Sequence, residues 1–562
     1  MMVTNPLNHS RRHQKKSTRF LLGSGRGFAL TSLFNQSILC LFILAFPVTG
    51  CMIGPDFVKP DAPVEDVWTQ EQDPRIKTEA ADFREWWTVF NDPVLNNLIE
   101  MAYGQNLNLQ IAGLRILEAR AQLGVAIGSQ FPQTQELNSS GKMTQLGENT
   151  ANGAAADKFH YDYQVGFDAA WELDFWGKFR RGVESANASL YSSYTSYDDI
   201  LVSLIAEVAR TYTQIRTFEQ RLVFVRQNAK LQEKALEIAT ARFEEGEDSE
   251  LDPAQARALL KSTQSAVPPL EAGLRQAKNA LAVLLGLPPV EIQAILGPPK
   301  AIPTAPIEVT VGIPAELLRR RPDIRRAEFD AAAQSAQIGI AKADFLPQIS
   351  LTGTLGFRTN VQGGVRSNNA TFADLFSVNS ITYGVGPEVQ WPILNYGRIM
   401  NNVRTEDARF QQLVVDYKNT VLKALQEVED GMVGFLRAQE QRELLAESVK
   451  SYERAVELAL VRYTEGLSTY QRVIDPQRDL TEEQDNLASV MGSVVTNLIS
   501  TYKALGGGWE LREGRDLVPV ETQEQMRERT YWGDLLSPEE RPDVQKQPPT
   551  GQEINILHKP DF

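Results

Sequence analysis

Cysteine and histidine are both scarce in this chain. Its 562 residues include two cysteines and four histidines. Cys40 lies within a leader-like N-terminal segment and Cys51 at its end, so removal of that leader would leave no disulfide and no cysteine cluster for a metal. The histidines beyond it, His160 and His558, fall in an expected loop and in the C-terminal tail, which are poor places for a nucleophilic catalytic site. We therefore expect no enzyme activity, no metal site and no cofactor.

Basic residues are also in short supply. The chain has 57 Lys and Arg against 71 Asp and Glu, and its formal net charge is −14. Residues 1–50 hold six of the basic residues and no acid, so their removal would lower the net charge to −20. Nucleic-acid binding relies on Lys and Arg that neutralise phosphate, so this class of partner is excluded.

The N-terminus has the features of a secretory signal. A basic region precedes an apolar stretch over residues 28–46, and Val48-Thr49-Gly50-Cys51 follows. These four residues resemble a bacterial lipobox, in which the cysteine becomes the lipid-bearing first residue of the mature protein. An uncleaved membrane anchor and a chance match are the alternatives. Residue 52 is Met and not Asp, so by resemblance to the lipoprotein sorting rule the inner-membrane retention signal is missing.

Two long stretches, 178–245 and 398–465, contain no proline. In both, apolar residues recur at alternating spacings of three and four, which is typical of a coiled-coil seam. The second seam has lapses at Gly431 and Arg442. Helices of about 69 residues would span roughly 100 Å at about 1.5 Å per residue. No compact domain accommodates that length, so we expect elongated helical hairpins that turn at Gly246 and Gly466.

Alternation of apolar and polar residues predicts strands. It is strict over 161–173 and recurs over 349–357 and 381–393, whereas the pattern over 137–144 is much weaker. Such strands, with one apolar, aromatic-rich face, fit a transmembrane β-barrel, and a soluble sandwich is the alternative. One chain offers four strands, whereas a closed barrel needs at least about eight. Two or more chains must therefore share one barrel.

The chain is internally duplicated. Tyr163, Gly177 and Gly246 recur as Tyr383, Gly397 and Gly466, all at an offset of 220 residues. A period this long, present twice, indicates a repeated domain-sized unit and not a solenoid.

Six segments together resemble one known family. They are Trp86-Trp87-Thr-Val-Phe-Asn-Asp-Pro93, Trp171-Glu-Leu-Asp-Phe-Trp-Gly-Lys178, Leu284-Leu-Gly-Leu-Pro-Pro289, Arg319-Arg-Arg-Pro-Asp-Ile-Arg-Arg-Ala-Glu328, Phe345-Leu-Pro-Gln-Ile-Ser-Leu-Thr-Gly353 and Lys503-Ala-Leu-Gly506. In this order they look like the TolC-type outer-membrane factors, specifically the NodT-type lipoprotein branch of resistance-nodulation-division efflux systems. The resemblance covers about residues 51–511.

The resemblance implies an α+β protein, mainly α, whose helical hairpins form an α-barrel tunnel. Each chain of a homotrimer would add four strands to one transmembrane β-barrel in the outer membrane. The trimer would dock a periplasmic adaptor protein and an inner-membrane resistance-nodulation-division pump, and would act as a passive exit duct for small molecules. A non-conducting structural or adhesive lipoprotein and a type I secretion duct are the alternatives.

These arguments divide the chain into five parts. They predict a signal peptide over 1–50, a lipidated extended tether over 51–84, repeats over 85–297 and 298–511, and a polar, disordered tail over 512–562. Each repeat should hold a helix, two strands, a long helix and a return helix, and the first helix should run from Pro93 toward Ile127. Firmly folded sequence should begin near Trp86.

The resemblance also places a periplasmic gate just beyond the two far turns. The run from Tyr470 to Arg478, which includes Arg472 and Asp475, is similar to the family's gating segment, and Asp252 lies in the first-half counterpart. Arg472 stands where some family members have a second Asp. The alternative role for Asp252 and Asp475 is helix capping, because each precedes a proline.

Lipidation at Cys51 can be tested directly. The Cys51→Ala variant should lose the mass of the lipid, while the strands should still hold it in the membrane, because the lipid is only one of two anchors. Mass spectrometry of the mature protein and detergent extraction measure both properties. An unchanged mature mass would show that the lipobox assignment is wrong.

Overall fold

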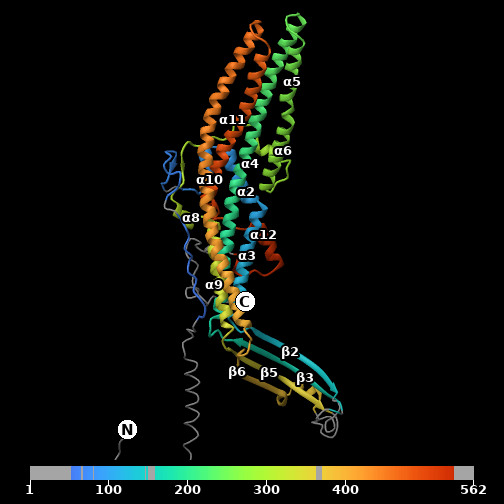
Figure 1. Cartoon of the computed structure of the whole chain (residues 1–562). Coiled ribbons are helices and arrows are strands. Elements are labelled where there is room, and N and C mark those ends of the chain that lie inside the picture. The colour runs from blue at the N-terminus through green and yellow to red at the C-terminus, as the bar shows by residue number, and fades with distance from the viewer. Residues whose placement is uncertain are drawn as a thin grey trace, which may run out of the picture. The chain divides into compact units, whose positions relative to one another are not determined.

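The structure is a computed structural model that describes residues 52–64, 67–79, 82–145, 147, 149, 159–362 and 370–536. The predicted signal peptide, Cys51 and the last 26 residues of the tail, 537–562, lie outside the described residues. The described residues from Met52 onward belong to one structural unit. In that unit a bundle of long helices continues at one end into a four-stranded sheet (Figure 1).

The same order of elements occurs twice. The first half contains α2 Pro93–Gln105, α3 Leu107–Gly128, β2 Thr134–Gln145, β3 Phe159–Glu172, α4 Lys178–Glu244, α5 Leu251–Ser265 and α6 Val267–Leu284. The second contains α8 Pro314–Arg320, α9 Pro322–Ala343, β5 Gln348–Gln362, β6 Ile381–Gln390, α10 Arg398–Thr464 and α11 Gln471–Ala504. Both α4 and α10 have 67 residues, and each begins after a glycine with positive φ, Gly177 or Gly397. The two proline-free stretches are thus long helices, as predicted.

Short elements complete the unit. They are β1 Ile76–Lys77, η1 Trp86–Phe90, α7 Ile292–Leu296, β4 Val309–Thr310, η2 Phe372–Phe376, η3 Val378–Ser380, η4 Trp509–Arg512, α12 Val520–Arg529 and η5 Gly533–Leu536. In the described part of the chain, no helix is both long and apolar enough to cross a membrane.

Two of the predicted helices are broken. The helix expected from Pro93 toward Ile127 is interrupted at Asn106, whose backbone is extended and whose side chain accepts a hydrogen bond from the Leu109 N–H at 2.9 Å. The first-half return helix is divided between α5 and α6 where Pro268 and Pro269 follow Val267, because proline lacks the N–H that continues a helix. The second-half return helix, α11, is continuous over 34 residues.

The four long strands form an antiparallel sheet in the order β2-β3-β5-β6. Val165 lies opposite Phe357, and Leu355 lies opposite both Phe167 and Tyr383, so the apolar residues of the strands share one face. Asp162 and Arg358 lie on the other face and form an ion pair at 2.7 Å. The weakly patterned segment over 137–144 is a full strand of 12 residues. It is mostly polar, and its pairing with β3 determines its conformation.

The seam on α4 is buried as its spacing predicts. Tyr197, Leu201, Val208 and Ile215 are almost fully covered, and α4 packs against α3, α5, α6, α9 and α11. On α10 the lapse at Gly431 is explained by close packing against α11. A Cβ at Gly431 would lie 2.7 Å from Thr501 Oγ1 and 3.1 Å from Thr501 Cα.

The segment before the first repeat is folded, and the expectation that folded sequence begins near Trp86 is wrong. Buried Arg181 of α4 donates to the Ile53 and Gly54 carbonyls and to Asp56 Oδ1, at 3.2, 3.3 and 2.8 Å. Lys59 forms an ion pair at 2.7 Å with Glu328, which is fully buried in α9. The lead is extended, as expected, but it lies against the helices.

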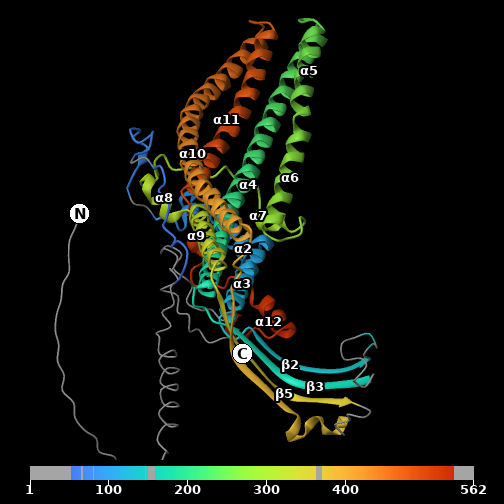
Figure 2. The same cartoon turned by 60° about the horizontal axis from the view of Figure 1, so that its bottom comes forward.

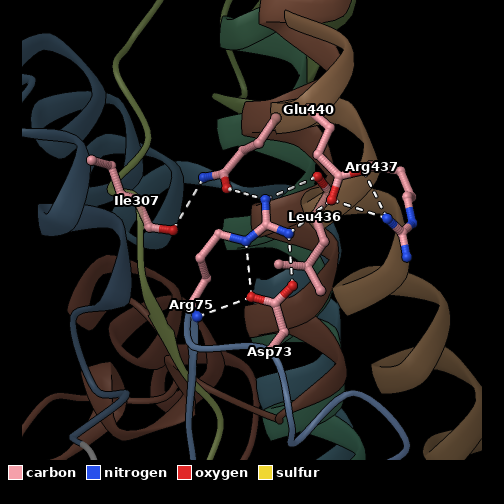
Figure 3. A network of polar contacts seen from close by, with 7 residues as sticks. Asp73, Arg75, Ile307, Leu436, Arg437 and Glu440 are labelled. Carbon is pink, nitrogen blue, oxygen red and sulfur yellow. Dashed lines mark hydrogen bonds and ion pairs between the residues drawn. The ribbon is translucent and has the colours of Figure 1, made fainter. Parts of the chain in front are cut away.

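Further along, residues 67–77 are fastened to the helices by a polar network (Figure 3). Arg75 donates to both carboxylate oxygens of Asp73, at 2.9 and 2.7 Å, and to Glu440 of α10 at 3.0 Å. The guanidinium lowers the pKa of Asp73 to about 2, so the carboxylate stays charged at neutral pH. Next to this network β1 pairs in parallel with β4. The network therefore joins the N-terminal segment to the second repeat.

The tail also departs from expectation. Residues 512–536 are not disordered, because Val518, Met526 and Leu536 are buried against Leu117 of α3. Gly113 of α3 permits this contact, since a Cβ there would lie 2.3 Å from the Leu517 carbonyl oxygen. The apolar residues of the tail are too widely spaced to give a periodic signal. Val518, Met526 and Leu536 nevertheless form one buried cluster with Leu117 of α3.

Replacement of Gly431 by alanine tests the close approach of α10 and α11. We expect Gly431→Ala to destabilise the protein by about 1–3 kcal/mol, the usual cost of overpacking a tight contact. Gly124→Ala is the matched control, because Gly124 is exposed on α3 and no heavy atom lies within 4 Å of its added Cβ. Thermal unfolding in detergent should show a lower midpoint for the first variant only. Equal midpoints would contradict the packing described here.

Candidate functional site

The candidate site lies at the two helical turns farthest from the sheet (Figure 1). Gly246 follows α4 and Gly466 follows α10, with φ of 80° and 72°. The two turns have the same hydrogen bonds: each glycine N–H donates to the third preceding carbonyl, that of Phe243 or of Tyr463. The positive φ at each turn explains why glycine recurs at this place in the repeat.

A small apolar cluster lies directly beneath these turns. Tyr463 and Tyr470 are both 1% exposed, and their rings meet edge to face with centroids 5.1 Å apart. Three alanines and a valine from α4, α5 and α11 complete it: Ala235, Ala239, Ala256 and Val473. Because small residues surround the two rings, the helices of both halves converge closely here.

A charged group from the first half reaches across to the second. Arg242 Nε donates to Asp248 Oδ2 at 2.6 Å, its guanidinium lies 5.2 Å from the centre of the Tyr463 ring, and Nη1 donates to the Thr464 carbonyl at 3.3 Å. The Tyr463 hydroxyl donates to the same Asp248 oxygen at 2.9 Å. Arg242, Asp248 and Tyr463, which we call the tip triad, thus link the turn of one hairpin to the turn of the other.

The carboxylate of the tip triad, Asp248, and the neighbouring carboxylate of Asp252 differ in electrostatic environment. Hydrogen bonding from Arg242 lowers the pKa of Asp248. Burial raises the pKa of Asp252, and the nearby Asp248 charge adds to this effect. The Asp252 carboxylate accepts a long hydrogen bond from the Tyr463 hydroxyl, at 3.5 Å from Oδ2. A further charge near Asp252 would therefore shift the pKa of its carboxyl group strongly.

Tyr470 contributes packing, unlike the hydrogen-bonded residues of the tip triad. Its hydroxyl has no hydrogen-bond partner among the described residues, and burial raises the pKa of the phenol. The ring is held by Tyr463 and the surrounding small residues, so its contribution at this position is packing.

The remaining predicted gate residues lie on the surface of α11. Asp475 accepts a hydrogen bond from Gln471 Nε2 at 2.9 Å and pairs with Arg478 at 3.6 Å, with side chains 45% and 59% exposed. Arg472 is also exposed, and within the described part of the chain its guanidinium has no hydrogen bond or ion pair. The five predicted residues therefore separate into buried Tyr470, half-buried Asp252, and a group of three on the surface of α11.

The alternative role in helix capping does not fit either aspartate. Helix α5 begins at Leu251 and α11 at Gln471, so Asp252 is the second helical residue and Asp475 the fifth. Neither helix has a side-chain cap hydrogen bond at its N-cap residue.

Sequence reasoning missed the members of the tip triad. Arg242 has a repeat equivalent, Arg462, but the equivalents of Asp248 and Tyr463 are Ser468 and Phe243. The signal was this break in the repeat. The phenol hydroxyl of Tyr463 has no counterpart at Phe243, the carboxylate of Asp248 has none at Ser468, and these two groups bond to one another. No group of three or more His, Cys, Asp or Glu that could hold a metal ion occurs among the described residues.

Comparison with known proteins agrees with the fold. Residues 98–287 and 313–507 match the family described as outer membrane efflux protein. The chain is 30% identical over 473 residues to Nodulation protein T of Rhizobium leguminosarum bv. viciae, which covers 84% of this chain and 93% of the relative. It is 30% identical over 440 residues to the pyoverdine export outer membrane protein OpmQ of Pseudomonas putida, which covers 77% and 90%.

A solved structure of the outer-membrane channel OprN superposes with a TM-score of 0.75 at 29% identity, over 82% of this chain and 100% of that one. These matches confirm the NodT-type resemblance, the TolC-like fold and the location in the outer membrane. The chain is an efflux channel of the outer membrane and belongs to the outer membrane efflux protein family.

Proposed function

We propose that the chain acts as a homotrimer in which three sheets close into one twelve-stranded barrel. The observation that carries this proposal is the open sheet. Its outer strands, β2 and β6, have no further strand beside them among the described residues. Lipid does not tolerate unpaired backbone groups, so the two edges must pair with other copies of the chain. Three copies of four strands exceed the minimum of about eight for a closed barrel.

The difference in polarity between the two faces of the sheet favours a water-filled duct. Large apolar side chains such as Tyr383, Val385 and Val389 are 81%, 77% and 64% exposed on one face. The opposite face carries the Asp162–Arg358 pair, and further along the same face the amide of Asn138 donates to Asp168. An apolar exterior and a polar interior are what a membrane barrel with a channel requires.

The duct is passive, and the energy for export comes from its partners. We propose that the helical end docks a periplasmic adaptor protein and an inner-membrane resistance-nodulation-division pump. The relative named for pyoverdine export supports a small-molecule cargo. Export of a protein by a type I secretion system and a non-conducting adhesive role remain the competing functions.

Conductance and mass test this function together. Purified protein should have the mass of three chains in detergent and should pass ions in a planar bilayer. A monomer or dimer would contradict the barrel closure, whereas a trimer that never conducts would favour the adhesive role. Deletion of the gene should sensitise cells to small toxic compounds; loss of a secreted protein without such sensitisation would favour the secretion role.

We further propose that the far turns form the periplasmic gate. The tip triad holds the two hairpins of one chain together, whereas Arg472, Asp475 and Arg478 are exposed and available to neighbouring chains. Three copies of Asp252 near the axis would repel one another, and burial already raises its pKa. Closure then depends on the triad within each chain and on charge pairing between chains.

Tyr463→Phe is the cleanest test of the triad, because it removes the hydroxyl and keeps the ring. Loss of a hydrogen bond to a charged group costs on the order of 1–2 kcal/mol, which would shift the closed–open equilibrium about tenfold. Conductance should rise, and cells should become more sensitive to bulky antibiotics. Arg454→Ala is the control, since Arg454 pairs with Glu457 on the exposed surface of α10.

Asp475→Ala and Arg478→Ala test pairing between chains. Their pair within one chain is long and exposed, and such pairs contribute about 0–1 kcal/mol. Loss of a pair worth at most about 1 kcal/mol would shift the closed–open equilibrium only a few-fold. A larger rise in conductance would place the main partners of Asp475 and Arg478 on a neighbouring chain. If these variants and Tyr463→Phe all conduct like the unmodified channel, the seal lies in the apolar packing around Tyr470.

A further inference from the structure

The connection between β5 and β6 contains a segment, Thr371–Ser380, that is held by several hydrogen bonds within itself. Asp374 accepts hydrogen bonds from the Thr371 N–H at 2.7 Å and from the Thr371 hydroxyl at 2.9 Å. The Ser380 hydroxyl donates to the Asp374 carbonyl at 2.7 Å and lies 3.2 Å from the Ser377 hydroxyl. These bonds fix η2 and η3 relative to one another.

The segment lies on the apolar face of the sheet. The Phe372 ring meets Tyr163 of β3 with centroids 4.9 Å apart, and the Phe376 ring meets Phe357 of β5 at 5.6 Å, both edge to face. Leu375, between them, is 2% exposed. In Figure 2 this short gold segment lies at the end of the strands that is farthest from the helices.

The outer side of the segment is nevertheless apolar. Phe372, Phe376 and Val378 are 60%, 65% and 83% exposed. Tyr161 of β3, whose ring stacks on that of Tyr163 with centroids 6.3 Å apart, adds a further exposed aromatic side chain to this end of the apolar face. A patch of this kind in water would be costly, at about 25 cal/mol per Å² of apolar surface.

We propose that Thr371–Ser380 docks into the outer leaflet of the membrane and binds lipid where acyl chains meet headgroups. The patch continues the face of the sheet that meets lipid, so the same lipid layer covers both. Aromatic side chains favour this depth, and internally bonded polar groups can enter a region poor in water. The proposal rests on the orientation of the barrel proposed above, which puts the strand ends away from the helices at the cell exterior.

A second copy of the chain is a less suitable occupant. Neighbouring copies join the sheet at its edges, β2 and β6. The segment instead contacts β3 and β5, the two central strands. It therefore lies over the middle of each chain's share of the barrel wall, where only lipid approaches.

Spin labels can measure what covers the segment. A nitroxide at Val378→Cys, in vesicles of phosphatidylethanolamine and phosphatidylglycerol, reports collisions with oxygen, which concentrates in lipid, and with a water-soluble nickel chelate. Val378 makes no ring contact, so its replacement leaves both aromatic pairs intact. Val385→Cys, on the apolar face, is the lipid control, and Thr354→Cys, on the polar face opposite Asp168, is the water control. Protein without an added cysteine gives the background from Cys51.

The expected oxygen-to-nickel collision ratio falls in the order Val385, Val378, Thr354, with Val378 several-fold above Thr354. A ratio at Val378 equal to that at Thr354 would place the segment in water and overturn the proposal. Few collisions with either reagent would mean that protein covers it, which would also overturn lipid docking. If Val385 itself collides mainly with nickel, the sheet does not lie in lipid, and the proposed barrel fails together with the docking.

Discussion

Burial of one apolar stripe along α4 is the interaction on which the rest of the structure depends. Helices from both repeats pack on it, α3, α5 and α6 from the first and α9 and α11 from the second. A 67-residue helix cannot bury its stripe within a compact domain, so its partners are arranged one after another along its length. The elongated hairpins, the sheet at one end and the turns at the other follow from this arrangement.

Buried charges on the same helix fix the segments that are not helical. Arg216 is fully buried, pairs with Glu219 at 2.7 Å and donates to the Leu296 carbonyl at 3.0 Å, which holds the connection after α7. Asp198 accepts from Arg512 and holds the start of the tail. A buried charge that loses its partner is costly, so each pair specifies one position for its segment along an otherwise uniform apolar stripe.

The features that could be predicted from the sequence are those with a period. Seam residues such as Leu201 and Val208, the alternating strand around Val165, and the turn glycines Gly246 and Gly466 all carry a local signal that tertiary contacts reinforce. The helix breaks at Asn106 and before Pro268 also had a local signal, a capping residue in one case and prolines in the other. The prediction of continuous helices gave more weight to the long apolar pattern that runs across both places. The tail had none, because its burial depends on a distant helix: Val518 lies against Gly113 of α3, and Met526 belongs to the cluster that includes Leu117. In the same way the residues proposed for the gate could be placed near the turns. The bonds among Arg242, Asp248 and Tyr463 cross from one repeat to the other, and no local pattern predicts such a contact.

The docked lead changes what a lipid on Cys51 would do. Met52 lies against Gly177, where the last strand of the first half passes into α4, and the Ile53 N–H donates to the Trp176 carbonyl at 3.1 Å. The chain from Met52 onward is therefore already ordered against the helices when the protein folds. A lipid on the residue before Met52 would be joined to this fixed segment and not to a flexible tether, so no further ordering of the lead would be needed at the membrane.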